Sequence, residues 1–254
     1  MAETTTTPSG AILAVDIGAT SIKFCAVDEG GHLLDEVKRQ PTPFPCLPAT
    51  LIDVVSRTIN ASGYSRAGVG FPGDMVDGHV IEPGNLSRAG GISTPIDPEI
   101  ERLWQGYDVE GELRARCTAR VLVVNDATLA AYGYAEGRGR ELVFTLGTGL
   151  GISLVVDGVW EKIRDVGSAM FHDVGTYDEV FGEPSRARDA GQWRRRLADA
   201  LAEFVREFCA DLVHVGGGNA RFVRAEDLAA IGCPVVFNDN EGTLRGAAQL
   251  FARH

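Results

Sequence analysis

The chain has 254 residues, of which 44% are hydrophobic and 23% are charged, and its formal net charge is −11. This composition excludes a disordered chain, and the negative charge argues against general binding of nucleic acid or of an anionic membrane, so we expect neither as a partner. Because no apolar run is long enough to cross a bilayer and the five cysteines lack metal-binding spacing, we expect a cytoplasmic protein with reduced thiols.

The first segments predict an antiparallel arrangement of strands. Residues 1–10 are rich in threonine and lack the apolar segment of a signal peptide, so we expect a disordered tail there. Apolar strands are expected over 11–17 and 22–27, and a third, antiparallel strand over 32–39.

The turn between the first two strands, residues 18–21, is a candidate phosphate loop. Glycine lets the backbone approach a phosphate, and turn N–H groups and hydroxyls can donate to it. Asp16, at the end of a buried strand, is placed to hold Mg²⁺ through water. An ordinary glycine hairpin, in which Asp16 satisfies turn amides, explains the same residues equally well.

The middle of the chain alternates helices and strands. The pattern predicts a helix at 51–59, a strand at 67–71, helices beginning at 97 and 108, a strand at 121–124 and a helix at 127–136. Ligands of α/β folds bind at the carboxyl ends of strands, so Asp126 is a candidate general base for a hydroxyl, with Asn125 orienting the acceptor. A helix cap is the commoner role for an aspartate at such a junction.

A second glycine-rich turn follows in the latter half of the chain. Residues 142–160 predict strand, turn and strand around LGTGLG at 146–151. Because no helix is expected after this string, we interpret it as a hairpin with a positive φ at Gly149, and not as a dinucleotide fingerprint. It is therefore a second candidate phosphate loop, and a tight hairpin without a ligand is the alternative.

Three consecutive glycines follow a strand near the C-terminus. Apolar residues over 193–212 fall at helical spacing, and the elements expected after them are a strand at 212–215, a strand at 235–237 and a helix at 241–253. Gly216, Gly217 and Gly218 end the first of these strands and form a wall without side chains, which suits a purine or its ribose. A flexible connector is the simpler interpretation of the glycines alone.

The two hairpins indicate a duplicated architecture. Each opens a half of the chain, and each is followed by helices and strands. We therefore expect two related α/β domains with the site in the cleft between them. The first would comprise residues 11–124 and the C-terminal helix at 241–254, and the second residues 125–240.

Six short strings occur in order along nearly the whole chain: AVDIGATSIKF at 14–24, GVGFPGDMVDG at 68–78, GNL at 84–86, VVNDATLAA at 123–131, LGTGLG at 146–151 and VGGGNAR at 215–221. Together they resemble the ROK family of sugar kinases and sugar-responsive repressors, closest to its polyphosphate-glucokinase-like branch. The resemblance implies an α/β, actin-like (ribonuclease H-like) fold of two domains with the active site in the interdomain cleft.

The resemblance also implies roles for individual residues, with Asp126 as the base that acts on the attacking hydroxyl. The first phosphate loop would comprise Asp16, Gly18, Thr20 and Lys23. The second would comprise Gly147, Thr148, Gly149 and Gly151, while Gly216, Gly217 and Gly218 would back the nucleoside. The sugar would be held by Pro72, Gly73, Asn85, Asn125, Asp126, Asp165 and Ser168.

Two departures from the family pattern bear on the ligands. The family's cysteine-rich zinc motif is missing, so we expect no structural zinc. The family's Glu-x-Gly-His, which binds sugar hydroxyls, is replaced by Asp165-Val-Gly-Ser168. The shorter side chains weaken the grip on the sugar, because a lost hydrogen bond in such a site costs roughly 1–3 kcal/mol. Glucose is therefore expected to be a poor acceptor.

The favoured hypothesis is a homodimeric sugar kinase that transfers a phosphoryl group from ATP or polyphosphate to a hexose hydroxyl, with Mg²⁺ as cofactor. The alternative is a non-catalytic sugar- or nucleotide-binding regulator of the same fold. The family's repressors carry an N-terminal helix-turn-helix, for which the first motif leaves no room. The donor stays open, since a basic track for polyphosphate would need Arg186, Arg188 and Arg194 to Arg196.

Overall fold

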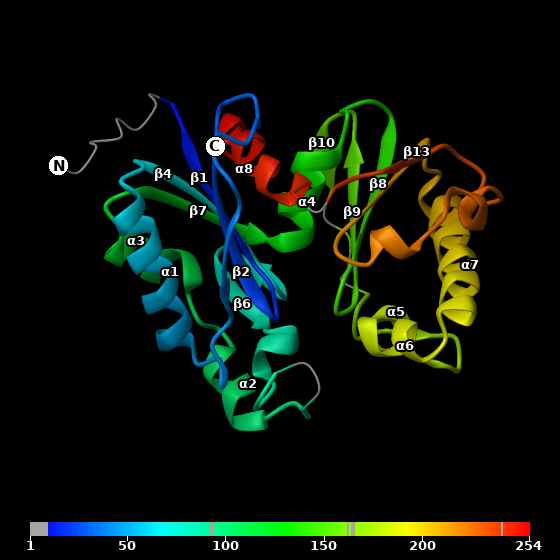
Figure 1. Ribbon diagram of the computed structural model, residues 1–254, viewed down its shortest axis with the longest axis horizontal. Helices are drawn as coiled ribbons and strands as arrows, with labels where there is room; N and C mark the ends of the chain where they lie inside the picture. Colours follow the sequence, from blue (N-terminus) through cyan, green and yellow to red (C-terminus); the bar gives the residue numbers. More distant parts are fainter. Residues whose placement is uncertain (1–9, 92–93, 162, 164–165, 240) are drawn as a thin grey trace. The chain divides into compact units, whose positions relative to one another are not determined.

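The computed structural model of the protein describes residues 10–91, 94–161, 163, 166–239 and 241–254 (Figure 1). The backbone divides into two compact units, one ending at Leu129 and completed by Thr243–His254, the other formed by Ala130–Gly242. The tail expected over 1–10 lies, except for Gly10, outside the described residues, and so does Asp165.

Unit 1 is built on a five-stranded sheet in the order β3-β2-β1-β4-β7. The strands are β1 (Ile12–Ile17), β2 (Ser21–Val27), β3 (Lys38–Pro41), β4 (Arg66–Phe71) and β7 (Arg120–Asn125). Strands β1, β2 and β3 pair antiparallel, whereas β4 and β7 run parallel to β1. The carboxyl ends of β1, β4 and β7 therefore meet at one edge of the sheet.

Helices cover both faces of this sheet. Helices α1 (Pro48–Ser62), α2 (Pro98–Trp104) and α3 (Val109–Arg116) supply side chains to one core, around the fully buried Trp104 and Phe71. Figure 1 shows α1 and α3 beside each other next to the sheet. Helix α8 (Gly242–Arg253) packs on the other face, where a Cβ on Gly68 would lie 2.9 Å from Ala247 Cβ. The glycine lets α8 approach the strand closely.

Unit 2 repeats the plan with a five-stranded sheet in the order β10-β9-β8-β13-β14. Its strands are β8 (Arg140–Leu146), β9 (Leu150–Val156), β10 (Val159–Glu161), β13 (Leu212–Gly216) and β14 (Val235–Phe237). Strands β8, β9 and β10 are antiparallel, and β13 and β14 run parallel to β8. The two sheets thus share one strand order and one set of directions, which confirms the predicted α/β class.

Helix α7 (Ala190–Phe208) covers one face of the second sheet through Trp193, Leu197, Leu201 and Phe204, the apolar side expected from the sequence. The other face carries the end of α4 (Asp126–Tyr134), whose Ala130, Ala131 and Tyr134 pack with Val143 and Val155. None of the helices in the described ranges combines the length and the apolar character that a membrane span requires.

The third predicted strand is present and antiparallel, but its predicted bounds, 32–39, are wrong. The ladder with β2 begins at Lys38 rather than at 32, and Leu33 makes only an isolated bridge to Val27. After β2 the chain reverses in a turn in which Asp28 Oδ1 accepts the backbone N–H groups of Gly30 and His32, and Leu34 N–H then donates to Ala26 O (2.8 Å) before the continuous ladder begins.

Several short elements were not predicted. They are the hairpin of β5 (Asp74–Val76) and β6 (His79–Glu82), the pair β11 (Met170–Phe171) and β12 (Gly175–Thr176), and helices α5 (Tyr177–Phe181) and α6 (Glu183–Arg188). Short elements of this kind show too little hydrophobic periodicity to be read from sequence.

Candidate active site

The β1–β2 turn is held firmly from the β3 side. Gly18 N–H donates to Ser21 O (3.0 Å) within the turn. Thr42 donates its hydroxyl to Gly18 O (2.6 Å) and its N–H to Thr20 O (3.2 Å). The backbone is therefore fixed, while residue Thr20 is exposed.

Asp16 and Lys23 flank this turn at opposed positions of the ladder. Lys23 Nζ lies 2.7 Å from Asp16 Oδ2, and both side chains are largely buried. Among the described residues there is no group of three or more His, Cys, Asp or Glu side chains that could hold a metal. A single buried carboxylate nevertheless fits Mg²⁺, which is usually held by one or two carboxylates, water and substrate phosphates.

The end of β4 meets the end of β7 through Asn125. Its Nδ2 donates to Gly73 O (2.7 Å), and its Oδ1 accepts the N–H groups of Ala127 (2.9 Å) and Thr128 (3.2 Å). Asn125 therefore caps helix α4, the role that Asp126 was a candidate for. Gly73 has φ +124°, and a Cβ there would overlap Glu82 O, so only glycine fits this loop.

Asp126 is the first residue of α4 and is partly buried. Its Oδ1 accepts the N–H of Ala127 (2.7 Å), which fixes the carboxylate at the helix N-terminus, where negative charge is favoured. A Cβ on Gly70 would lie 3.3 Å from Asp126 Cα, so β4 passes directly beside it.

Asn85 lies in the short helix η1 (Gly84–Ser87), and its Oδ1 accepts from Arg88 Nε (2.7 Å). A Cβ on Gly84 would lie 4.0 Å from Gly73 Cα, so η1 sits against the Pro72-Gly73 loop. Unit 1 thus gathers Asn85, Asn125, Asp126 and this loop at one place. Of the remaining sugar candidates, Ser168 is exposed in a turn of unit 2 and Asp165 lies outside the described ranges.

LGTGLG forms the β8–β9 hairpin, in which Gly147 N–H donates to Gly149 O (3.1 Å). Leu146 O and Gly147 O accept from the backbone and side chain of Asn219, at 2.9 and 2.8 Å. The expected positive φ at Gly149 is wrong. A Cβ at this position would overlap the carboxylate of Asp178, so the glycine makes room for that side chain. Gly151 lies in β9 opposite Thr145, beyond the tip of the turn.

The three glycines after β13 serve three different purposes. A Cβ on Gly216 would lie 2.6 Å from the Tyr134 ring, so this position makes room for an aromatic side chain. Gly217 has φ +87° and passes against Leu146 of the hairpin, where a Cβ would lie 2.8 Å from Leu146 N. Gly218 faces open space. The glycines are therefore a built junction and not a flexible connector.

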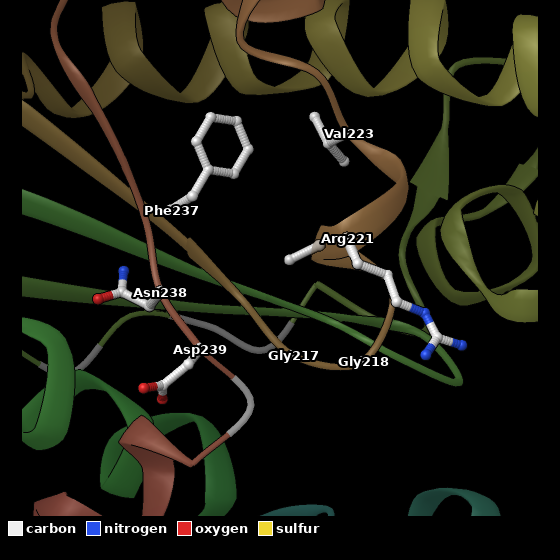
Figure 2. Close-up of a pocket in the computed structure, with 8 residues that line it drawn as sticks. Gly217, Gly218, Arg221, Val223, Phe237, Asn238 and Asp239 are labelled. Carbon is white, nitrogen blue, oxygen red and sulfur yellow. The ribbon is translucent and has the colours of Figure 1, made fainter.

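A pocket of about 490 Å³ opens at this junction. Figure 2 shows Phe237 and Val223 forming its apolar side, Arg221 extending past Gly218, and Asn238 and Asp239 following Phe237 along the chain. Residue Phe237 is 40% exposed. Sequence reasoning missed all five side chains, although an aromatic residue at the end of a strand beside a glycine wall was a usable signal.

The arginines near this pocket are largely engaged. Arg186 Nε donates to Glu183 Oε2 (2.8 Å), and this bond holds the pKa of Glu183 below its ordinary range. The guanidinium groups of Arg186 and Arg221 lie 3.8 and 4.7 Å from the centroid of the Phe222 ring. Arg194 pairs with Asp227 at 3.4 Å. Two arginines of the suggested polyphosphate track are thus already paired.

Comparisons with known proteins agree on one family. A model described as "ROK family" matches residues 12–162. Glucokinase of Streptomyces coelicolor is 29% identical over 157 residues, which are 58% of this chain and 44% of that protein. Glucokinase of Thermotoga maritima is 26% identical over 178 residues, 66% of this chain and 51% of that protein. The chain therefore spans about half the length of these relatives.

Solved structures give the same result over nearly the whole chain. The inorganic polyphosphate/ATP-glucomannokinase of Arthrobacter sp. strain KM superposes with a TM-score of 0.80 and 28% identity, covering 97% of this chain and 100% of that one. A ROK family glucokinase of Streptomyces griseus, in complex with glucose and AMPPNP, gives a TM-score of 0.76 and 19% identity, covering 96% and 100%. Because the Streptomyces griseus protein is only 19% identical in sequence, its similarity shows a shared fold and no more.

Proposed function

Because the chain belongs to the ROK family and has the actin-like two-domain fold of its sugar kinases, we propose that it is a carbohydrate kinase. It would transfer a phosphoryl group from ATP or polyphosphate to a hydroxyl of a hexose. The observation that carries the proposal is the junction of β7 and α4. There Asn125 caps the helix and holds the Gly73 loop, so the cap does not depend on the Asp126 carboxylate.

In the proposed reaction, Asp126 accepts the proton of the sugar hydroxyl as that oxygen attacks the terminal phosphorus of the donor. The new oxygen–phosphorus bond forms while the bond from phosphorus to the bridging oxygen breaks, and the shortened donor leaves with the electron pair. Phosphoryl transfer needs mainly positioning and charge stabilisation. Asn125 serves positioning, since it holds the acceptor loop and the helix that carries Asp126 in one place.

The two hairpin turns are proposed to bind the phosphates of the donor. Both are fixed turns whose glycines are only partly buried, and Lys23 adds a cation beside the first. Asp16 would anchor Mg²⁺ through water, and the ion would neutralise charge on the donor phosphates.

For the donor, the pocket beside Gly218 favours a nucleoside triphosphate. Phe237 and Val223 offer an apolar surface on which a base can pack, and a polyphosphate chain has no group that could use it. The pairing of Arg186 with Glu183 and of Arg194 with Asp227 weakens the case for a polyphosphate track. Both donors nevertheless belong in the test.

We propose that the acceptor is a hexose other than glucose, or that this chain binds its hexose less tightly than typical family members bind glucose. Ser168 replaces a histidine of the family pattern and is exposed, which leaves space for a larger acceptor or for water.

A coupled phosphorylation assay over a panel of hexoses and amino-sugars, run once with Mg-ATP and once with polyphosphate, tests the proposal. We expect turnover with at least one sugar, with ATP more effective than polyphosphate. Calorimetry with the same sugars and an ATP analogue is run in parallel. Binding of both ligands without turnover on any sugar would favour the non-catalytic regulator instead.

A further inference from the structure

We propose that Asp178, in the first turn of α5, is a positioning residue that fixes the tip of the β8–β9 hairpin and ties it to the turn carrying Ser168. The inference rests on the proposed function, in which that hairpin binds the donor and that turn faces the acceptor. The site residues inferred from sequence do not include Asp178.

The first contact is with the hairpin itself. Leu150 N–H donates to Asp178 Oδ1 (3.0 Å), directly after the glycine at the turn. The same carboxylate fills the space that any side chain at position 149 would need. The missing side chain at Gly149 therefore leaves the space that the Asp178 carboxylate occupies.

The second contact is with the turn before β11. Asp178 N–H donates to Gly167 O (3.0 Å), and a Cβ on Gly167 would lie 3.0 Å from both carboxylate oxygens. Ser168 follows directly in this turn, which is closed by Ala169 N–H donating to Val166 O (2.9 Å). One residue thus contacts the donor hairpin with its side chain and the Ser168 turn with its backbone.

Helix α5 is capped at its start and contacts the hairpin at its end. At its start, Thr176 and Glu179 form a reciprocal capping box. At its end, Gly182 N–H donates to Asp178 O (2.9 Å), and a Cβ on Gly182 would overlap Thr148 O of the hairpin. The hairpin tip therefore lies against the first turn and the end of the same helix.

The carboxylate acts here as a hydrogen-bond acceptor. Asparagine keeps an oxygen at the same place and removes the negative charge, whereas alanine removes the acceptor. Asp178→Asn and Asp178→Ala therefore separate the hydrogen bond from the charge. Glu179→Ala is the matched control, because it weakens the capping box of α5 without removing the bond to Leu150.

The primary readout is hydrogen–deuterium exchange of the peptide that contains Leu150, which requires no turnover. In Asp178→Ala we expect exchange at Leu150 to rise at least fivefold, as for the loss of one hydrogen bond of about 1 kcal/mol. Asp178→Asn should stay within twofold of the wild type. Unchanged exchange in Asp178→Ala, or an equal rise in Glu179→Ala, would overturn the proposal.

The second readout is kinetic, with Mg-ATP as donor and the best acceptor of the panel. Asp178→Ala should raise the KM for ATP about tenfold with a smaller loss of kcat, and Asp178→Asn should restore the KM. An equal fall of kcat in both variants would mean that the charge takes part in the reaction, and would overturn a positioning role. If the wild type phosphorylates no sugar but Leu150 exchange rises in Asp178→Ala as expected, the proposed function fails. The positioning role of Asp178 is then still supported.

Discussion

Lys23 Nζ lies 2.7 Å from Asp16 Oδ2, directly across the β1–β2 ladder. Only 11% of the Asp16 side chain and 15% of the Lys23 side chain are exposed, so the ammonium group fixes the carboxylate in one orientation. The turn that follows is a candidate phosphate loop. The pair thus places one anion and one cation at its base, and under the proposed function the anion would anchor the metal ion and the cation would contact a donor phosphate.

Asp16→Asn should raise the Mg²⁺ concentration needed for half-maximal rate on the order of tenfold, the equivalent of about 1.4 kcal/mol. The amide keeps the shape of the side chain but loses the charge that attracts the ion. A Mg²⁺ titration at saturating donor and acceptor measures the effect. Asp53→Asn, which removes a half-exposed carboxylate on α1 outside the proposed site, is the control. Equal shifts in the two variants would show that Asp16 is not the anchor of the metal.

Asp126→Asn should lower kcat by about 10²–10⁴-fold, the usual contribution of a general base. The fold should be unaffected, because Asn125 and not Asp126 supplies the cap on Thr128 N–H. Steady-state kinetics and a thermal melt of the same preparation measure the two quantities. Activity above roughly a tenth of wild type would contradict the role of the base.

Asn125→Ala should behave differently from Asp126→Asn. It removes the helix cap and the bond to Gly73 O, so we expect the free energy of unfolding to fall by about 1–3 kcal/mol. Activity should fall as well, through a displaced acceptor loop. Denaturant unfolding compares the two variants, and an unchanged midpoint for Asn125→Ala would mean that its contacts contribute nothing to stability.

The duplicated hairpins were predictable because each consists of two apolar strands around a glycine turn, a local pattern. The contact of Asp178 with the hairpin was not, because it joins residues 28 positions apart that only the packing of α5 on the hairpin brings together. The role of glycine at position 149 was missed as well, because it also depends on the distant residue Asp178. Sequence indicated a turn that needs a special φ, and the structure shows a neighbouring carboxylate. The pocket residue Phe237 is likewise defined by tertiary neighbours rather than by a motif.

Gly149→Ala should therefore impair donor binding even though alanine tolerates the backbone conformation. Its Cβ would overlap the Asp178 carboxylate, so either that side chain must leave the hairpin tip and give up its bond to Leu150 N–H, or the tip itself must move. Calorimetry with an ATP analogue should show affinity reduced about tenfold or more, with acceptor affinity unchanged. Gly191→Ala, at a position in the first turn of α7, is the matched control. Unaltered donor affinity in Gly149→Ala would mean that the hairpin is only a turn.

Phe237→Ala should distinguish the two donors. Removing a half-exposed phenyl ring from the pocket wall costs about 1–3 kcal/mol of base packing, so the KM for ATP should rise about tenfold or more. Polyphosphate carries no base, and its KM should stay the same. Parallel kinetics with both donors provide the measurement. An unchanged KM for ATP would place the nucleoside elsewhere.

Buried Glu141 supports a prediction about stability and pH in unit 2. Burial by itself would raise its pKa, but the backbone N–H groups of residues 136–138 and the His214 side chain outweigh burial, so the pKa of Glu141 lies below its ordinary value of 4.5. His214 Nδ1 faces Asn238 Nδ2 (3.3 Å), which is a donor, so Nδ1 accepts and Nε2 donates to Glu141 Oε2 (2.8 Å). The carboxylate thus accepts four hydrogen bonds.

A carboxyl whose pKa is lower in the folded than in the unfolded protein stabilises the fold above the unfolded value, and this contribution is lost as the pH falls through the folded value. Glu141→Gln should therefore lower stability at neutral pH by about 3–5 kcal/mol, because the amide turns a donor toward groups that themselves donate. As the pH falls below about 4.5, wild type and variant should converge. Thermal melts from neutral to acid pH, with the exposed Glu161→Gln as control, measure the difference. A gap between wild type and Glu141→Gln that stays constant over this range would show that the ionised carboxylate is not what stabilises unit 2.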